Sequence, residues 1–210
     1  MGKIEITKKV LGICATNCYT VVDTETKEAL IIDPADRADV LIRDWKDKGV
    51  TPTAVLLTHG HFDHIGALAG VKKEYPEIRV YAAAEEKEVM ESPALNLSSS
   101  FDAAFTAQAD IYLEDGAEIE VLGRKCKCLL VPGHTKGGMC YYFPEENVVF
   151  TGDTLFCYSV GRTDFPTGDA KALENAIREQ LFTLPDETLV LPGHDAQTMI
   201  GKEKKGNPYF

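Results

Sequence analysis

The sequence predicts an α/β (α+β) protein in which two β-sheets pack face to face with helices on their outer sides. Three observations predict it. Short apolar runs of strand length occur in both halves of the 210-residue chain, helical patterns stand between them, and no repeat or linker interrupts the chain. Because each sheet must bury an apolar face, this pattern favours two packed sheets covered by helices. The length suits a single domain over residues 1–210.

The first half alternates strand and helix signals. Arg37–Lys48 is amphipathic, with Val40, Leu41 and Trp45 at helical spacing and Gly49 as a stop signal. The other helices predicted here are Ala67–Tyr75, which Pro76 ends, and Ala84–Glu91. The predicted strands are Lys3–Lys9, Cys18–Asp23, Ala29–Asp33, Ala54–Thr58 and Arg79–Ala82.

The second half is rich in strands. The segment Leu95–Asp110 mixes Ser, Ala and Phe, and a helix followed by a mobile loop is one interpretation of it. Lys171–Phe182 is a predicted helix with Leu173, Ile177 and Leu181 on one stripe. The predicted strands are Glu118–Leu122, Cys126–Val131, Met139–Phe143, Val148–Thr151 and Thr188–Leu191.

Charge and targeting signals narrow the function class. The formal net charge of -11 argues against a nucleic-acid partner, because nucleic-acid binders carry a basic face. The first ten residues lack the apolar core of a signal peptide, and no window holds the roughly 20 apolar residues of a membrane span. We therefore expect a cytoplasmic protein without a membrane partner whose six cysteines are reduced. The sequence leaves its oligomeric state open.

Four predicted strands run directly into residues that can bind a metal. In three of them a glycine immediately precedes the candidate ligand, which permits a sharp turn over the sheet edge. All five histidines of the chain fall at these positions. Accidental placement of all five is far less plausible than a metal site. The four segments are His59-Gly60-His61-Phe62-Asp63-His64, Pro132-Gly133-His134, Gly152-Asp153 and Pro192-Gly193-His194.

The spacing of the first segment has a direct physical meaning. Residues two apart in an extended chain point the same way, so His59 and His61 can bind one cation. A helix is expected next, and Asp63 and His64 in its first turn would project toward a neighbouring position. Imidazole with carboxylate suits zinc, and also iron or manganese. Asp153 is the natural bridge between two cations, because it is taken as the only acidic strand-end residue outside the first segment.

These motifs resemble the metallo-β-lactamase superfamily. THGHFDHIG at 58–66, PGHTKGG at 132–138, TGDTLF at 151–156 and PGH at 192–194 follow the order of that family across nearly the whole chain. TNCY at 16–19 and GRTDFPTGD at 161–169 resemble its glyoxalase II (hydroxyacylglutathione hydrolase) branch, especially the short bacterial members. The resemblance implies a four-layer αββα sandwich with metals at one edge.

The resemblance also implies a ligand set and a reaction. One ion would bind His59, His61 and His134, a second would bind the remaining set of Asp63, His64 and His194, and Asp153 would bridge them. Two divalent ions are implied, with zinc expected and iron or manganese as alternatives. The implied reaction is hydrolysis of a thioester, S-lactoylglutathione or a related hydroxyacyl thioester, by a hydroxide bound to the metals. Asp63 and Asp153 would be the catalytic carboxylates.

The chain departs from this branch in its substrate contacts. The residues after His194 do not match the basic C-terminal segment by which full-length glyoxalase II holds the carboxylates of glutathione. Lys136, Arg162 and Lys202 are candidates to bind an anionic substrate tail, with a solvated or structural charge as the alternative for each. Arg162 would then fix its loop through Asp164.

Two further residues have open roles. Asp195 stands where the family usually has glycine, and it would either tune the second metal from outside its ligands or point to solvent. Cys157 lies close to the GDT motif, where it would contact substrate or only pack.

Three other functions share part of the pattern. A mononuclear iron persulfide (sulfur) dioxygenase would use only His59, His134 and Asp153 as ligands. A non-catalytic, metal-stabilised binding module is a second alternative, although structural zinc sites are usually closed by four ligands, often cysteines. A true β-lactamase is less expected, since those enzymes are exported and lack the bridging Asp.

Overall fold

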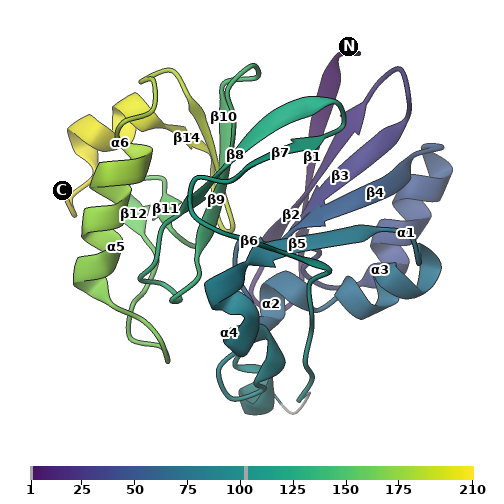
Figure 1. Cartoon of the computed structure of the whole chain (residues 1–210), viewed down its shortest axis with the longest axis horizontal. Helices are drawn as coiled ribbons and strands as arrows, with labels where there is room; N and C mark the ends of the chain where they lie inside the picture. The colour runs from purple at the N-terminus through teal and green to yellow at the C-terminus, as the bar shows by residue number, and fades with distance from the viewer. Residues whose placement is uncertain (1, 102–103) are drawn as a thin grey trace.

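A computed structural model describes residues 2–101 and 104–210, and these form four layers in the order helix, sheet, sheet, helix (Figure 1). The predicted αββα sandwich is confirmed. The first sheet has the order β1-β2-β3-β4-β5-β6, in which β1 to β3 are antiparallel and β3 to β6 are parallel. Its strands are β1 Ile4–Leu11, β2 Thr16–Asp23, β3 Glu28–Ile32, β4 Thr51–Leu56, β5 Arg79–Ala83 and β6 Ile111–Leu113.

The second sheet has the order β14-β13-β10-β9-β8-β7. Only its β10 and β13 pair in parallel, and the other neighbours are antiparallel. Its strands are β7 Glu118–Val121, β8 Arg124–Leu130, β9 Met139–Phe143, β10 Val148–Gly152, β13 Leu189–Pro192 and β14 Thr198–Met199. A separate hairpin is formed by β11 Leu155–Phe156 and β12 Ser159–Val160.

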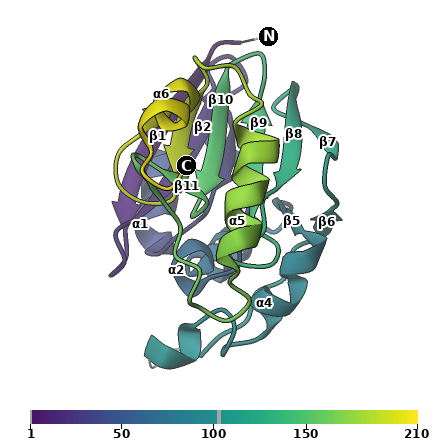
Figure 2. The same ribbon diagram turned by 90° about the vertical axis from the view of Figure 1, so that its left-hand side faces the viewer.

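Helices cover the outer face of each sheet. Figure 1 shows α1 and α3 beside the first sheet, and Figure 2 shows α5 and α6 in front of the second. None of the helices within the described ranges combines the length and apolar character that a membrane crossing requires. The helices are α1 Ala38–Asp47, α2 Phe62–Ile65, α3 Leu68–Glu74, α4 Lys87–Glu91, α5 Ala170–Ala176 and α6 Ile200–Gly206, with 3-10 turns at Ala84–Glu86 and Ser98–Phe101 and a π-helical turn at Ile177–Leu181.

Strand β3 shows why the sheets stack. Its side chains alternate between two cores: Ala29 and Ile31 face α1 and α3, whereas Leu30 and Ile32 face the second sheet. Since both faces of the strand are covered, its apolar run is continuous rather than alternating, as is typical of central parallel strands. A third core lies between the second sheet and α5. The site therefore rests on two sheets that are each held from both sides.

Several elements differ from the prediction. The predicted helix 171–182 is α-helical over Ala170–Ala176 and continues as a π-helical turn. The short strands β6 and β14, the β11–β12 hairpin and α6 were not predicted, because runs of two or three residues carry no periodicity. Within 95–110, the described residues form a 3-10 turn at Ser98–Phe101 rather than an α-helix, and residues 102–103 lie outside the described ranges.

All six cysteines lie in described residues and are free thiols, as predicted. Cys126 and Cys128 are buried in the core between the two sheets, where they pack as small apolar side chains.

Candidate metal centre

The carboxyl ends of four strands meet at one edge of the sandwich. Strands β10 and β13 are parallel neighbours, and β8 runs in their direction because β9 lies antiparallel between them. Strand β4 reaches the same edge from the first sheet, where the N–H of Met139 donates to the carbonyl of Thr58 at 2.8 Å. The four predicted segments therefore converge, although they are far apart in the sequence.

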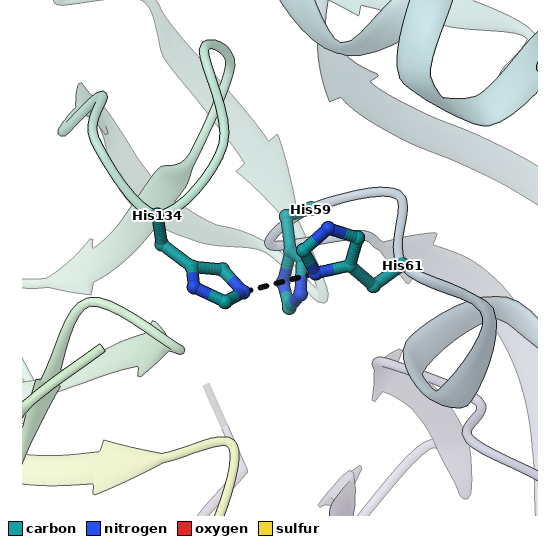
Figure 3. A group of neighbouring side chains, drawn as sticks. All are labelled: His59, His61 and His134. Atoms are coloured by element: carbon teal, nitrogen blue, oxygen red, sulfur yellow. Dashed lines mark hydrogen bonds between the residues drawn. The ribbon is translucent and has the colours of Figure 1, made fainter. Parts of the chain in front are cut away.

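Three histidines form the first group at this edge. His59 and His61 come from the loop after β4, and His134 comes from the loop after β8 on the opposite side (Figure 3). Their ligand nitrogens all lie within 4.8 Å of one another. Nδ1 of His61 and Nε2 of His134 are 2.9 Å apart. The structure thus brings together the three side chains predicted for one ion.

A second group adjoins the first. Ligand atoms of Asp63, His64 and His194 also lie within 4.8 Å of one another. Nε2 of His194 is 3.4 Å from Oδ2 of Asp63. Helix α2 begins after His61, so Asp63 and His64 lie in its first turn as predicted. The remaining three predicted ligands are therefore also adjacent.

Asp153 touches both groups. Its Oδ2 is 3.3 Å from Nε2 of His194 and 3.7 Å from Nε2 of His134, and its Oδ1 is 3.3 Å from Nε2 of His64. One carboxylate thus faces imidazoles of the first and second groups at once. This is the position that the sequence predicted for a bridging ligand.

Two glycines allow the strand ends to approach this closely. Gly152 has φ of +48°, and a Cβ there would collide with the side chain of Thr58. A Cβ on Gly193 would collide with the carboxylate of Asp153 and lie 2.7 Å from the His64 ring. A larger side chain at either position would push the candidate ligands apart.

Hydrogen bonds outside the cluster orient its rings. Nδ1 of His64 donates to Oδ2 of buried Asp33 at 2.8 Å, and Nδ1 of His134 donates to the carbonyl of Arg162 at 2.7 Å. Nδ1 of His59 lies 3.2 Å from the hydroxyl of Thr58, which itself donates to Asp33 at 2.6 Å. Because Nδ1 of each of these three histidines is engaged outside the cluster, its Nε2 is left to face the centre, as is usual for metal-binding histidines.

Asp33 corrects one sequence inference. Asp153 was taken as the only acidic strand-end residue outside the first segment, and this was wrong because Asp33 directly follows β3. Asp33 nevertheless acts through His64 and Thr58 and belongs to neither of the two candidate ligand groups. Its place at a strand end before Pro34 was the signal that could have identified it.

Glu86 is a second residue that the sequence did not reveal. Its fully buried carboxylate accepts from the N–H of Gly60 at 2.8 Å on one oxygen. The other oxygen accepts from the Thr135 hydroxyl and the Gly137 N–H, both at 2.9 Å. Glu86 therefore ties the loop of His59 and His61 to the loop of His134. Burial raises the pKa of this carboxyl to about 7 despite the three hydrogen bonds.

The donor atoms fit a pair of metal ions. Nε2 of His59 and Nε2 of His61 are buried and have no hydrogen-bond partner among the described residues. An orphaned buried nitrogen is costly unless something binds it. The full set offers five imidazoles and two carboxylates without sulfur, which suits zinc, iron or manganese. This is a histidine-rich site of the binuclear type.

The first group is neutral in the metal-free protein. Burial lowers the pKa of His61 to about 3, and it also lowers the pKa values of His59 and His134 below their ordinary value. Their lone pairs are therefore available for a cation at neutral pH without loss of a proton.

The second group carries protons instead. Burial alone would lower the pKa of His194, but its hydrogen bonds with Asp153 and Asp63 outweigh burial and raise that pKa to about 9. Burial likewise acts to lower the pKa of His64, yet the charges of Asp153 and Asp63 raise it above the ordinary value. For Asp63, burial acts upward, and the charge of His64 with the His194 hydrogen bond lowers the pKa to about 2. A cation in this group must displace protons.

An open cavity of about 730 Å³ leads to both groups. Asp63, His134, Asp153 and His194 line it, so the candidate ligands remain accessible. Its other walls are largely apolar and include Phe62, Leu97, Phe101, Phe156, Val160 and Phe165. A cavity of this volume suits a small molecule.

Only one of the three predicted anion-binding residues lines this cavity. Arg162 does so, and its guanidinium donates to both oxygens of Asp164 at 2.7 Å, the contact that the sequence analysis named beside substrate binding. Lys136 instead pairs with Glu88 and lines a different hollow. Lys202 lines a third hollow beside α6.

Asp195 and Cys157, whose roles the sequence left open, differ in their position relative to the cavity. Asp195 lines the cavity and has φ of +60°, which is in the left-handed region that favours glycine. Cys157 does not line the cavity in the described structure, whereas Cys14, which the sequence analysis did not single out, does. Burial and the charge of Asp63 raise the pKa of the Cys14 thiol, which disfavours its thiolate.

Curated relatives match along almost the whole chain. The chain is 37% identical over 202 residues to the probable metallo-hydrolase YqgX of Bacillus subtilis, covering 95% of this chain and 94% of that protein. It is 34% identical over 204 residues to the hydroxyacylglutathione hydrolase GloC of Haemophilus influenzae, covering 92% of each.

Solved structures agree with these matches. The BLEG-1 B3 metallo-beta-lactamase superposes with a TM-score of 0.92 at 38% identity, covering 98% of this chain and 99% of that one. A di-iron-bound form of TTHA1623 superposes with a TM-score of 0.85 at 36% identity, covering 97% and 100%. The model of the Metallo-beta-lactamase superfamily matches residues 11–194, a span that contains every candidate ligand. This chain therefore belongs to the metallo-beta-lactamase superfamily.

Proposed function

We propose that this protein is a metal-dependent hydrolase that cleaves a thioester. One observation carries the proposal: two groups of imidazole and carboxylate ligands share Asp153 at the floor of an accessible cavity. Seven donors around two ions leave coordination positions open, which is typical of catalytic rather than structural sites. The non-catalytic binding module is therefore disfavoured.

Two divalent ions bound there would polarise a carbonyl group and lower the pKa of a water molecule from about 16 toward 7. His59, His61 and His134 would hold one ion. Asp63, His64 and His194 would hold the other. Asp153 would bridge the two ions.

The carboxylates have a second task in this proposal. The side chains of Asp63 and Asp153 are each about 13% exposed and line the cavity, so an attacking water can reach each carboxylate. A hydrogen bond from the water to Oδ2 of Asp63 would orient it, and that carboxylate is already held by the hydroxyl of Thr16 at 2.7 Å. A thiolate leaves readily, so the reaction requires no separate acid. We therefore assign Asp63 and Asp153 as the catalytic carboxylates.

The names of two relatives support the reaction class. YqgX is called a probable metallo-hydrolase and GloC a hydroxyacylglutathione hydrolase. S-Lactoylglutathione or a related hydroxyacyl thioester is accordingly the substrate we propose. Zinc is the metal we propose, with iron as the alternative that the di-iron form of TTHA1623 supports.

A persulfide dioxygenase is the second candidate. Such an enzyme needs one iron held by His59, His134 and Asp153. The assembled second group of Asp63, His64 and His194 favours hydrolysis, because it would have no ligand role in that enzyme.

The test combines an analysis of bound metal with assays of three reactions. Protein purified without added metal is analysed by mass spectrometry and assayed for S-lactoylglutathione hydrolysis, persulfide-dependent oxygen uptake and nitrocefin hydrolysis. We expect two ions per chain and thioester hydrolysis above the other activities. One iron with oxygen uptake would establish the dioxygenase instead, and dominant nitrocefin turnover would establish a β-lactamase.

A further inference from the structure

The cavity beside the metal centre is larger and more apolar than a lactoyl group requires. Its 730 Å³ lies within the range of pockets that bury drug-sized ligands, whereas a lactoyl group ends in a single methyl. Four phenylalanines from different parts of the chain reach this one space. These are Phe62 of α2, Phe101 of the 3-10 turn, Phe156 of β11 and Phe165 of the loop before α5.

The aromatic wall is held next to the candidate ligands. Phe165 packs edge-on against His61 with ring centroids 5.6 Å apart, and Phe156 packs against His194 at 6.2 Å. Phe62 and Phe101 stack at 4.3 Å, and Phe101 remains 46% exposed. A thioester carbonyl at the ligands would therefore have aromatic surface on both sides of it.

Charges in the same cavity do not favour a multiply charged carrier. Of the described residues that line it, Arg162 is the one Lys or Arg. Its charge is neutralised by Asp164 and its guanidinium lies 3.9 Å from the centroid of the Phe165 ring. Asp195 adds a negative charge to the wall. An anionic tail on the thiol carrier would thus compete with Asp164 for Arg162, and the net charge of -11 gives it little long-range attraction.

We propose that this cavity selects thioesters that carry an uncharged apolar group, aromatic or bulky alkyl, next to the scissile carbonyl. This inference rests on the proposed hydrolase function and names its substrate class. A phenyl group buried against the wall gains contact that a methyl group cannot make, whereas charges on the thiol carrier gain little. Since a single methylene in a hydrophobic pocket changes specificity by about 10–200-fold, a phenyl substituent is expected to raise kcat/KM at least tenfold.

The experiment places the same phenyl group on either side of the thioester. Holoenzyme is assayed with S-mandeloylglutathione against S-lactoylglutathione for the acyl side. The lactoyl thioester of benzyl mercaptan is compared with S-lactoylglutathione for the thiol side. At least a tenfold gain in either arm supports the proposal and identifies the side, and no gain in either arm, with S-lactoylglutathione still hydrolysed, overturns it.

A binding measurement separates this inference from the proposed function. S-Benzylglutathione and S-methylglutathione are thioethers that no hydrolase can cleave, and calorimetry gives their dissociation constants directly. We expect the benzyl compound to bind at least tenfold more tightly. If no thioester were hydrolysed, the proposed function would fail, but the two dissociation constants would still test the apolar preference of the cavity. Equal binding of both thioethers would overturn that preference.

Two variants localise the effect. Phe101→Ala removes one of the four rings of the wall and should lower the phenyl-over-methyl ratio without loss of bound metal. Tyr209→Ala is the matched control, because Tyr209 is a 58% exposed aromatic residue outside this cavity and should leave the ratio unchanged. An unchanged ratio in Phe101→Ala, or an equal loss in both variants, would contradict the assignment to this wall.

Discussion

The carboxylate of Asp33 accepts a hydrogen bond from Nδ1 of His64 at 2.8 Å, and both side chains are buried. The same carboxylate accepts from the N–H and hydroxyl of Thr58, next to His59. One residue that lies outside the candidate ligand groups therefore sets the orientation of two imidazoles that belong to them. Loss of such an outer contact typically lowers metal affinity by about 10–100-fold.

Asp33→Asn tests this relationship. The change keeps the size of the side chain but removes the charge and one acceptor, so His64 loses the partner that fixes its ring. We expect metal affinity to fall about 10–100-fold, as competition with a chelator would measure. Asp36→Asn, an exposed neighbour, is the control and should bind metal as the wild type does. Unchanged affinity in Asp33→Asn would show that the contact does not orient the ring.

Asp153→Ala tests the proposed bridge. Without this carboxylate, the two ions would repel each other without compensation, and both groups would lose a shared contact. We expect metal content and thioesterase activity to be lost together, with metal content followed by mass spectrometry. Asp186→Ala removes an exposed carboxylate paired with Lys204 and should change neither. A variant that kept both metals and full turnover would refute the bridging role.

Proton release on metal binding tests the charge state of the second group. The pKa of His194 in the metal-free protein is raised to about 9 from an ordinary 6.5. The pairing of protonated His194 with Asp63 and Asp153 therefore contributes to the free energy of unfolding of the metal-free protein. This contribution is fully present below pH 6.5 and is lost as pH rises through about 9. Zinc must displace these protons, so its affinity should rise across the same window.

Calorimetry in buffers of different ionisation enthalpy counts the protons released when zinc binds. At pH 7 we expect release from the second group and none from His61, whose pKa is lowered to about 3. His194→Ala should release fewer protons than the wild type. Zinc binding without any proton release would mean that His64 and His194 are neutral in the metal-free protein.

Glu86→Gln tests the buried tie between the two loops. Because burial raises the pKa of Glu86 to about 7 from an ordinary 4.5, the folded metal-free protein binds more protons than the unfolded chain between these values. Its contribution to stability therefore decreases as pH rises from about 4.5 to about 7. The free energy of unfolding of the wild type, measured relative to Glu86→Gln, should fall across this window.

The matched control for that experiment is Glu88→Gln, which changes an exposed carboxyl two residues away. Its free energy of unfolding should follow the wild type through the same window. If the difference between wild type and Glu86→Gln stayed constant with pH, Glu86 would not titrate there.

The sequence predicted the candidate ligands because their signal is local. Each follows an apolar strand directly, and the H-x-H-x-D-H spacing alone indicates that His59 and His61 share one side. The four layers were predicted for the same reason, since strand and helix periodicity is read within short windows.

The contacts of Asp33 and Glu86, which support the candidate ligands from outside, could not be predicted in this way. Asp33 meets His64 across 31 residues of sequence, and Glu86 meets Gly137 across 51. The strand-end position of Asp33 is a local signal, but nothing in the local sequence of Asp33 or Glu86 shows which distant residue it will contact. The place of a charged side chain in the fold was equally unpredictable. Lys136 and Lys202 were chosen as anion-binding candidates by their charge, but both line other hollows in the folded protein.

The number of metal ions per chain tests the central claim most directly. Native mass spectrometry of the protein, followed by stepwise removal of metal with a chelator, would count the ions in one experiment. We predict two ions per chain in the wild type, one of them held by His59, His61 and His134. In His61→Ala, the chelator should therefore remove the ion of this first group before the ion of the second group. A wild type that binds a single ion at saturating metal would contradict a paired centre and the hydrolytic mechanism built on it.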